Sequence, residues 1–85
     1  MKLTLKYFAS LREALGPGET LAWTPEGAPT AAALRAWLRT RSDAHAQALA
    51  PGRAVRVAID QVMADEAAPL HDGAEVAFFP PVTGG

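Results

Sequence analysis

The fold is decided by the stretch Thr30-Ala31-Ala32-Ala33-Leu34-Arg35-Ala36-Trp37-Leu38-Arg39-Thr40-Arg41, the longest helical pattern in the chain. Thr30 is a typical N-cap residue, and an apolar stripe follows at helical spacing, formed by Leu34, Trp37 and Leu38. The pattern predicts a helix over residues 31–41, whose solvated side carries Arg35, Arg39 and Arg41. One helix covers only one face of a sheet, so the other face should stay at least partly solvated.

Strand patterns lie on both sides of this helix. Apolar residues alternate over residues 2–8, 19–24, 54–60 and 74–79, and Val62-Met63 begins a short return strand. Shorter helical segments are expected over residues 9–15 and 43–50. The compact arrangement for this order is an α+β fold, a mixed sheet wrapped around one main helix, which is the β-grasp of ubiquitin-like proteins. We divide the chain into a β-grasp domain, residues 1–79, and an extended tail, residues 80–85.

Composition limits the function. The chain has 85 residues, enough for one small domain with a thin core, and its formal charge of −1 argues against nucleic acid as a partner. It contains no cysteine, which excludes disulfides, thiolate metal sites and cysteine-borne sulfur chemistry. No apolar run is long enough to span a membrane and the N-terminus lacks a signal-peptide core, so we expect a cytoplasmic protein without membrane contact.

The sequence lacks the side-chain groupings that catalysis or metal binding requires. His45 and His71 are far apart and neither has a ligand partner nearby in sequence, so we interpret both as surface or helix-end residues. The stretch Gly16-Pro17-Gly18 is too short for a phosphate-binding loop and has no lysine after it. We therefore expect no metal site, no permanently bound cofactor and no catalysis by this chain's own side chains.

The C-terminal tail carries the functional information. Its sequence is Pro80-Pro81-Val82-Thr83-Gly84-Gly85. The two prolines end the strand ladder and hold the chain extended, and six residues in that conformation reach about 19 Å. Because the last two residues have no side chains, the tip is narrow enough to enter a channel in another protein. This design predicts that the terminal carboxyl group is delivered to a partner; the alternative is an ordinary frayed end.

Two phenylalanines lie near the root of this tail. By strand alternation, Phe8 and Phe79 face away from the core residues of their own strands. We interpret them as an apolar patch for a partner, which the flexible side chain of Met63 could extend. The alternative is a small second core that covers both rings.

The ending Asp72-Gly73-Ala74-Glu75-Val76-Ala77-Phe78-Phe79-Pro80-Pro81-Val82-Thr83-Gly84-Gly85 resembles the family of molybdopterin synthase small subunits, which are ubiquitin-like sulfur carriers. The opening Tyr7-Phe8-Ala9-Ser10-Leu11-Arg12-Glu13 is similar to the same family. The likeness spans nearly the whole chain, and the run from Phe78 to Gly85 is its most specific part. Asp60 stands before Gln61 where that family has an amide side chain.

The resemblance implies a sulfur carrier in molybdenum cofactor biosynthesis. A ubiquitin-activating-type enzyme would use ATP to adenylate the Gly85 carboxylate, and a sulfur donor would then displace AMP to leave a thiocarboxylate. The large subunit of molybdopterin synthase would receive the tail and build the dithiolene of molybdopterin, in a heterotetramer whose active-site residues belong to that subunit. Gly84 would form the slim neck. Phe8, Met63 and Phe79 match partner-facing positions of the family, and Arg12 matches an arginine near the partner.

Three other functions remain open on the sequence. A thiamin-pathway sulfur carrier would have the same fold and end chemistry but a different acceptor, and its chains tend to be shorter and to lack the Phe-Phe-Pro-Pro approach. A ubiquitin-like protein modifier would join Gly85 to a lysine through an isopeptide bond. A plain interaction domain would leave the tail idle.

Overall fold

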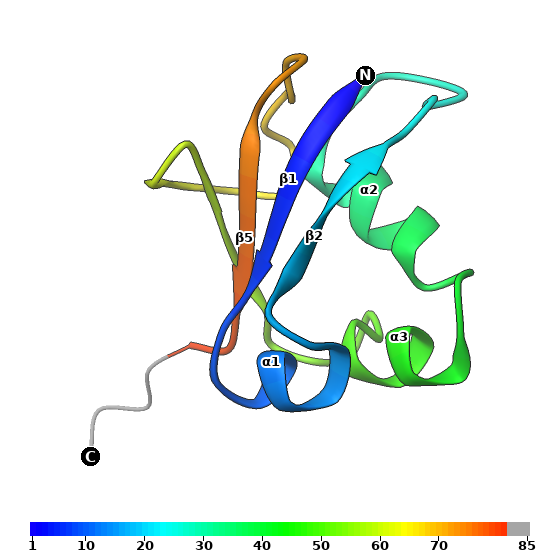
Figure 1. The fold of residues 1–85 in the computed structure, drawn as a ribbon, viewed down its shortest axis with the longest axis vertical. Helices are drawn as coiled ribbons and strands as arrows, with labels where there is room; N and C mark the ends of the chain where they lie inside the picture. Colours follow the sequence, from blue (N-terminus) through cyan, green and yellow to red (C-terminus); the bar gives the residue numbers. More distant parts are fainter. Residues whose placement is uncertain (82–85) are drawn as a thin grey trace.

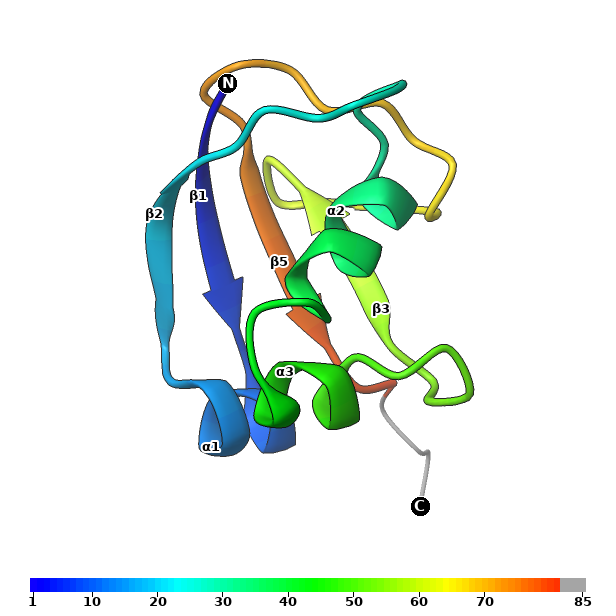
Figure 2. The ribbon, with the colours of Figure 1, turned by 90° about the vertical axis from the view of Figure 1, so that its right-hand side faces the viewer.

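The computed structural model of the chain describes residues 1–81. Its five-stranded sheet carries helix α2 across one face, and the shorter helices α1 and α3 lie together at one end of the molecule (Figures 1 and 2). In chain order the elements are β1 (Lys2–Tyr7), α1 (Ala9–Leu15), β2 (Gly18–Ala22), α2 (Ala31–Leu38), α3 (Asp43–Ala48), β3 (Arg56–Ile59), β4 (Val62–Ala64) and β5 (Glu75–Phe79). This order confirms the expected mixed α+β arrangement.

The sheet places the last strand near its middle. The strand order is β2-β1-β5-β3-β4, and β5 pairs parallel with β1 and antiparallel with β3. The register sets Leu5 beside Val76 and Tyr7 beside Phe78. Because β5 is hydrogen-bonded on both sides, the chain that leads into the tail begins from a fixed point of the sheet.

The core lies between the sheet and the helices. Alternate residues of β1, namely Leu3, Leu5 and Tyr7, are buried against β5 residues Val76 and Phe78. The cluster also includes Leu34 and Leu38 of α2, Leu49 after α3, Leu21, Trp23 and Val57, while Trp37, Val55 and Ile59 pack partly buried against it. Apart from Leu49, these are the residues that the strand and helix periods place inward, because each element buries one face.

The prediction that Arg35 lies on a solvated helix face is wrong. Its side chain is only 7% exposed. Its Nε donates to the carbonyl of Leu49 (2.9 Å), and its terminal nitrogens donate to the carbonyls of Ala50 (2.6 Å) and Arg53 (3.0 Å) and to Glu66 (2.5 Å). The last carbonyls of a helix lack partners within it, and Arg35 supplies donors just where α3 ends.

Helix α2 is shorter than predicted. It ends at Leu38, and the backbone N–H groups of Thr40 and Arg41 donate to carbonyls only three residues earlier, at Trp37 and Leu38. Such bonds tighten the end of a helix into a turn, which redirects the chain toward α3. Arg41 leaves the helix and pairs with Glu19 at 2.8 Å while its guanidinium lies 5.5 Å from the centre of the Trp37 ring. Within residues 1–81, no helix combines the length and the apolar content that crossing a membrane demands.

Candidate functional site

The site begins where β5 ends. Phe79 is the last residue of β5 and pairs with Arg56 of β3; Pro80 and Pro81 follow, both partly buried. Neither proline has a backbone N–H, so the ladder cannot continue through them. The other residues that we predict to form the tail, Val82, Thr83, Gly84 and Gly85, lie outside the described residues.

Strand alternation places adjacent aromatic residues at the ends of β1 and β5 on opposite faces of the sheet. Tyr7 and Phe78 are buried in the core and their rings stack with centroids 6.4 Å apart. Their neighbours Phe8 and Phe79 face the opposite, outer side of the sheet, where Phe8 is 45% exposed and Phe79 is partly buried. The structure therefore places both rings where the sequence predicts them, on the side without a covering helix.

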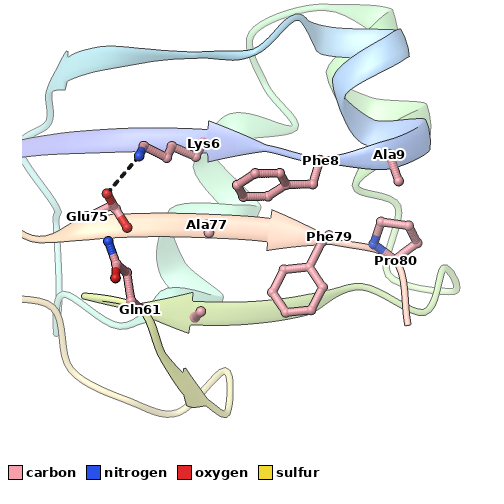
Figure 3. Close-up of a pocket in the computed structure, with 9 residues that line it drawn as sticks. Lys6, Phe8, Ala9, Gln61, Glu75, Ala77, Phe79 and Pro80 are labelled. Carbon is pink, nitrogen blue, oxygen red and sulfur yellow. Dashed lines mark ion pairs between the residues drawn. The ribbon is translucent and has the colours of Figure 1, made fainter. Parts of the chain in front are cut away.

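A groove of about 480 Å³ runs over this outer face. Figure 3 shows the rings of Phe8 and Phe79 near its end at Pro80, with the Lys6–Glu75 ion pair and Gln61 toward the other end. The residues that line it are Lys6, Phe8, Ala9, Ala58, Gln61, Glu75, Ala77, Phe79 and Pro80. The lining is mostly apolar, and the charges of Lys6 and Glu75 offset one another at a distance of 3.0 Å.

Met63 lies beside the groove and does not line it. It is well exposed on β4 and pairs with Ala58 of β3, and directly paired residues of antiparallel strands point to the same face. It therefore extends the outer apolar surface by one strand. Sequence analysis missed the exposed Val62, which pairs with Ile59 on the other face at the edge of the sheet.

Arg12 is not brought together with the groove residues. It is exposed in α1, whose buried residue is Leu11, and it does not line the groove. Its predicted role near a partner stays a prediction.

A charged pair that the sequence did not suggest fixes the turn at the polar end of the groove. Asp60 and Gln61 join β3 to β4, both with positive φ (51° and 67°), the backbone of a tight type I′ hairpin turn. Asp60 accepts hydrogen bonds from the backbone N–H of Glu75 (3.0 Å) and from Nε2 of His71 (2.6 Å), while Nδ1 of His71 lies 2.9 Å from the carbonyl oxygen of Asp72. These contacts hold Gln61 beside the groove.

The same contacts shift two pKa values in opposite directions. The bond from the Glu75 backbone N–H, followed by that from His71, lowers the pKa of Asp60. The bond to Asp60, followed by that to the Asp72 carbonyl, raises the pKa of His71. Both ring nitrogens of His71 face oxygen acceptors, which favours the doubly protonated ring. His71 is thus a surface residue, as interpreted, but one with a carboxylate partner eleven positions away.

The arrangement is suited to binding. The groove is open, two phenyl rings wall one end of it, and that end adjoins the root of the tail at Pro80. Within residues 1–81, no three His, Cys, Asp or Glu side chains come together as a metal site would need. An exposed apolar groove with a polar end is typical of a surface that another protein covers.

Known proteins resemble this chain in sequence and in fold. The sequence model of the ThiS family matches residues 5–85. The molybdopterin synthase sulfur carrier subunit of Escherichia coli (strain K12) is 43% identical over 79 residues, which cover 93% of this chain and 94% of that protein.

Two solved structures have the same architecture. The H. volcanii small archaeal modifier protein 1 is 27% identical, with a TM-score of 0.66 and coverage of 95% of this chain and 98% of that one. A chain from the complex of subunits 1 and 2 of molybdopterin-converting factor from Helicobacter pylori superposes with a TM-score of 0.64 at 23% identity and covers both chains fully. These matches confirm the β-grasp fold. The chain belongs to the ThiS family and, within it, to the sulfur carrier subunits of molybdopterin synthase.

Proposed function

We propose that this chain carries sulfur as a thiocarboxylate on Gly85 and delivers it to the large subunit of molybdopterin synthase for the dithiolene of molybdopterin. The observation that carries the proposal is the position of Pro80, the root of the tail. The chain reaches Pro80 from a strand paired on both sides, and Pro80 itself lines an exposed apolar groove. A partner that grips the groove therefore meets the tail root at a fixed place and can direct the tail into its own active site.

The loading chemistry requires only the terminal carboxylate of this chain. A carboxylate is a poor electrophile, so one oxygen of Gly85 attacks the α-phosphorus of ATP, giving an acyl adenylate and releasing pyrophosphate. A sulfur donor at the oxidation level of hydrogen sulfide then attacks the acyl carbon and displaces AMP. The product is a thiocarboxylate. Its sulfur then attacks a carbon of the acceptor to give a thioester, and water cleaves the bond between the acyl carbon and the sulfur, which leaves the sulfur on the acceptor and restores the carboxylate. Because the sulfur is bound to the terminal carboxyl carbon, no cysteine of this chain is needed.

The first step needs a ubiquitin-activating-type enzyme that supplies the ATP site. The second partner, the large subunit, follows from the E. coli relative, whose name makes it one subunit of a synthase. We expect two carriers on a large-subunit dimer, in the cytoplasm, where ATP and the activating enzyme would be available.

The energetics favour exchange between these partners. Burying the part of Phe8 that is exposed, 45% of the residue, contributes about 1 kcal/mol, and Phe79 contributes a similar amount or less. Ordering each residue of the tail costs about 1 kcal/mol or more. Because the two rings only partly offset that cost, contacts along the tail must supply the rest. A carrier bound in this way can leave the activating enzyme and move to the large subunit.

Intact mass spectrometry of the chain purified from cells tests the proposal. We expect a fraction heavier by the difference between sulfur and oxygen, and we expect deletion of Gly85 to abolish it. A protein modifier, as the archaeal relative is named, would instead yield high-molecular-weight conjugates that vanish with Gly85. Finding only the unmodified mass, while the activating enzyme and a sulfur source are active, would contradict the proposal.

A further inference from the structure

The floor of the groove is built from two alanines. Ala77 of β5 pairs with Lys6 of β1 on one side and with Ala58 of β3 on the other, and Ala58 pairs with Met63 of β4. This row crosses four strands on the outer face. Its two central members are alanines, whose methyl group is the smallest carbon side chain. Both are nearly covered, with 7% and 9% exposure, although no helix lies on this face.

Longer neighbours make the space above these alanines a groove. Phe8 and Phe79 each stand two positions further along their strands than Lys6 and Ala77, so they point to the same face about 7 Å away. Figure 3 shows Ala77 between the Lys6–Glu75 pair on one side and the two phenyl rings on the other. A larger residue at position 77 would fill this space.

We propose that the groove receives one large, uncharged apolar side chain from the docking surface of the large subunit, and that Ala58 and Ala77 determine which side chain fits. This inference rests on the proposed function. The charged pair at one end is already neutralised internally, so no free charge favours a charged occupant. The lining is continuous with the tail root through Pro80, so a partner that takes the tail covers the groove.

Two matched substitutions test this inference. Ala77→Ile fills the floor, while Ala22→Ile places the same side chain on the same outer face, at the exposed end of β2 beside Lys2 and away from the groove. Binding of each full-length variant to the cognate large subunit is measured by isothermal titration calorimetry, with melting temperatures as the check on folding. We expect Ala77→Ile to weaken binding by about tenfold or more, the penalty of overfilling a packed site, and Ala22→Ile to change it by less than about twofold.

A second substitution tests the inference if Ala77→Ile impairs folding. In that case binding is measured with Ala58→Val, which adds less volume to the same floor and should also weaken binding. Wild-type-like binding by a folded Ala77→Ile or Ala58→Val variant would overturn the inference while leaving the proposed function intact, as would an equal loss in Ala22→Ile. Failure of the wild-type carrier to bind the large subunit would overturn both together.

Discussion

Phe78 and Phe79 are adjacent in sequence, but the structure predicts that they have different roles. Removing Phe78 should bring the chain close to unfolding, whereas removing Phe79 should leave it folded and weaken its binding to the large subunit. Phe78 is fully buried and its ring stacks on Tyr7. Replacing a buried phenylalanine by alanine costs about 3–5 kcal/mol of unfolding free energy. At about 4–8 °C per kcal/mol for a domain of this size, Phe78→Ala should lower the melting temperature by roughly 12–40 °C. Since small domains have little more stability than this in total, the variant should be close to unfolding.

Phe79→Ala removes a ring that is only partly buried, on the face without helices. Most of the surface of Phe79 is already covered in the free chain, so its removal should cost about 1–2 kcal/mol of unfolding free energy, well below the loss at Phe78. The large subunit covers the part of the ring that is still exposed, so affinity should also fall, by up to about fivefold for about 1 kcal/mol. The two variants thus separate folding from docking by one step along a strand.

The assay pairs thermal unfolding with titration calorimetry. Unfolding is followed by circular dichroism and by the fluorescence of Trp23 and Trp37, whose ring centroids lie 6.5 Å apart. Calorimetry against the large subunit gives the affinity of each folded variant. If Phe79→Ala destabilises the chain as strongly as Phe78→Ala, the outer ring belongs to a second core and the docking interpretation is refuted.

Three further changes probe polar groups of the fold. Arg35→Met removes a buried donor to three carbonyls and Glu66 and should cost about 2–4 kcal/mol in denaturant unfolding; a loss below about 1 kcal/mol would contradict its structural role. Tyr7→Phe should leave stability unchanged or raise it by up to about 1 kcal/mol, because the Tyr7 hydroxyl is buried without a hydrogen-bond partner among the described residues, and burial raises its pKa to about 12; a clear loss would reveal a partner. The raised pKa of His71 means that its bond to Asp60 stabilises the fold fully below the ordinary imidazole pKa of about 6.5 and is lost as pH rises through the raised value. The lowered pKa of Asp60 means that its contribution is lost only as pH falls through that lowered value. The lowered pKa of His45 acts in the opposite sense to His71 but is shared by wild type and His71→Gln, so the melting-temperature difference between these two chains should shrink from about pH 6 toward pH 9; a difference that does not change with pH would refute the pairing.

Strand alternation made much of this molecule predictable. A period of two assigns each residue of β1 and β5 to a face, so the pattern alone places Tyr7 and Phe78 inward and Phe8 and Phe79 outward. The same rule leaves one helix for one face, which gives the β-grasp. These inferences succeed because they depend on neighbours within a few residues.

The features that sequence analysis missed depend on distant parts of the chain. The helical pattern predicts that Arg35 is solvated. It cannot show that Arg35 donates hydrogen bonds to carbonyls 14 and 15 residues later in the chain. The Asp60–His71 pair forms only because the β3–β4 turn folds back on the loop before β5. In an alanine-rich chain Ala58 and Ala77 carry no signal, and only the register that sets them opposite one another makes them the floor of a groove.

The proposed function requires the terminal carboxyl carbon of Gly85 to carry the sulfur. The most direct measurement is cofactor production in cells that lack their own carrier and are supplied with the full chain or with the chain lacking Gly85. We predict that the full chain restores molybdopterin and that the shortened chain, with the same melting temperature, restores none. Restoration by the shortened chain would contradict the account.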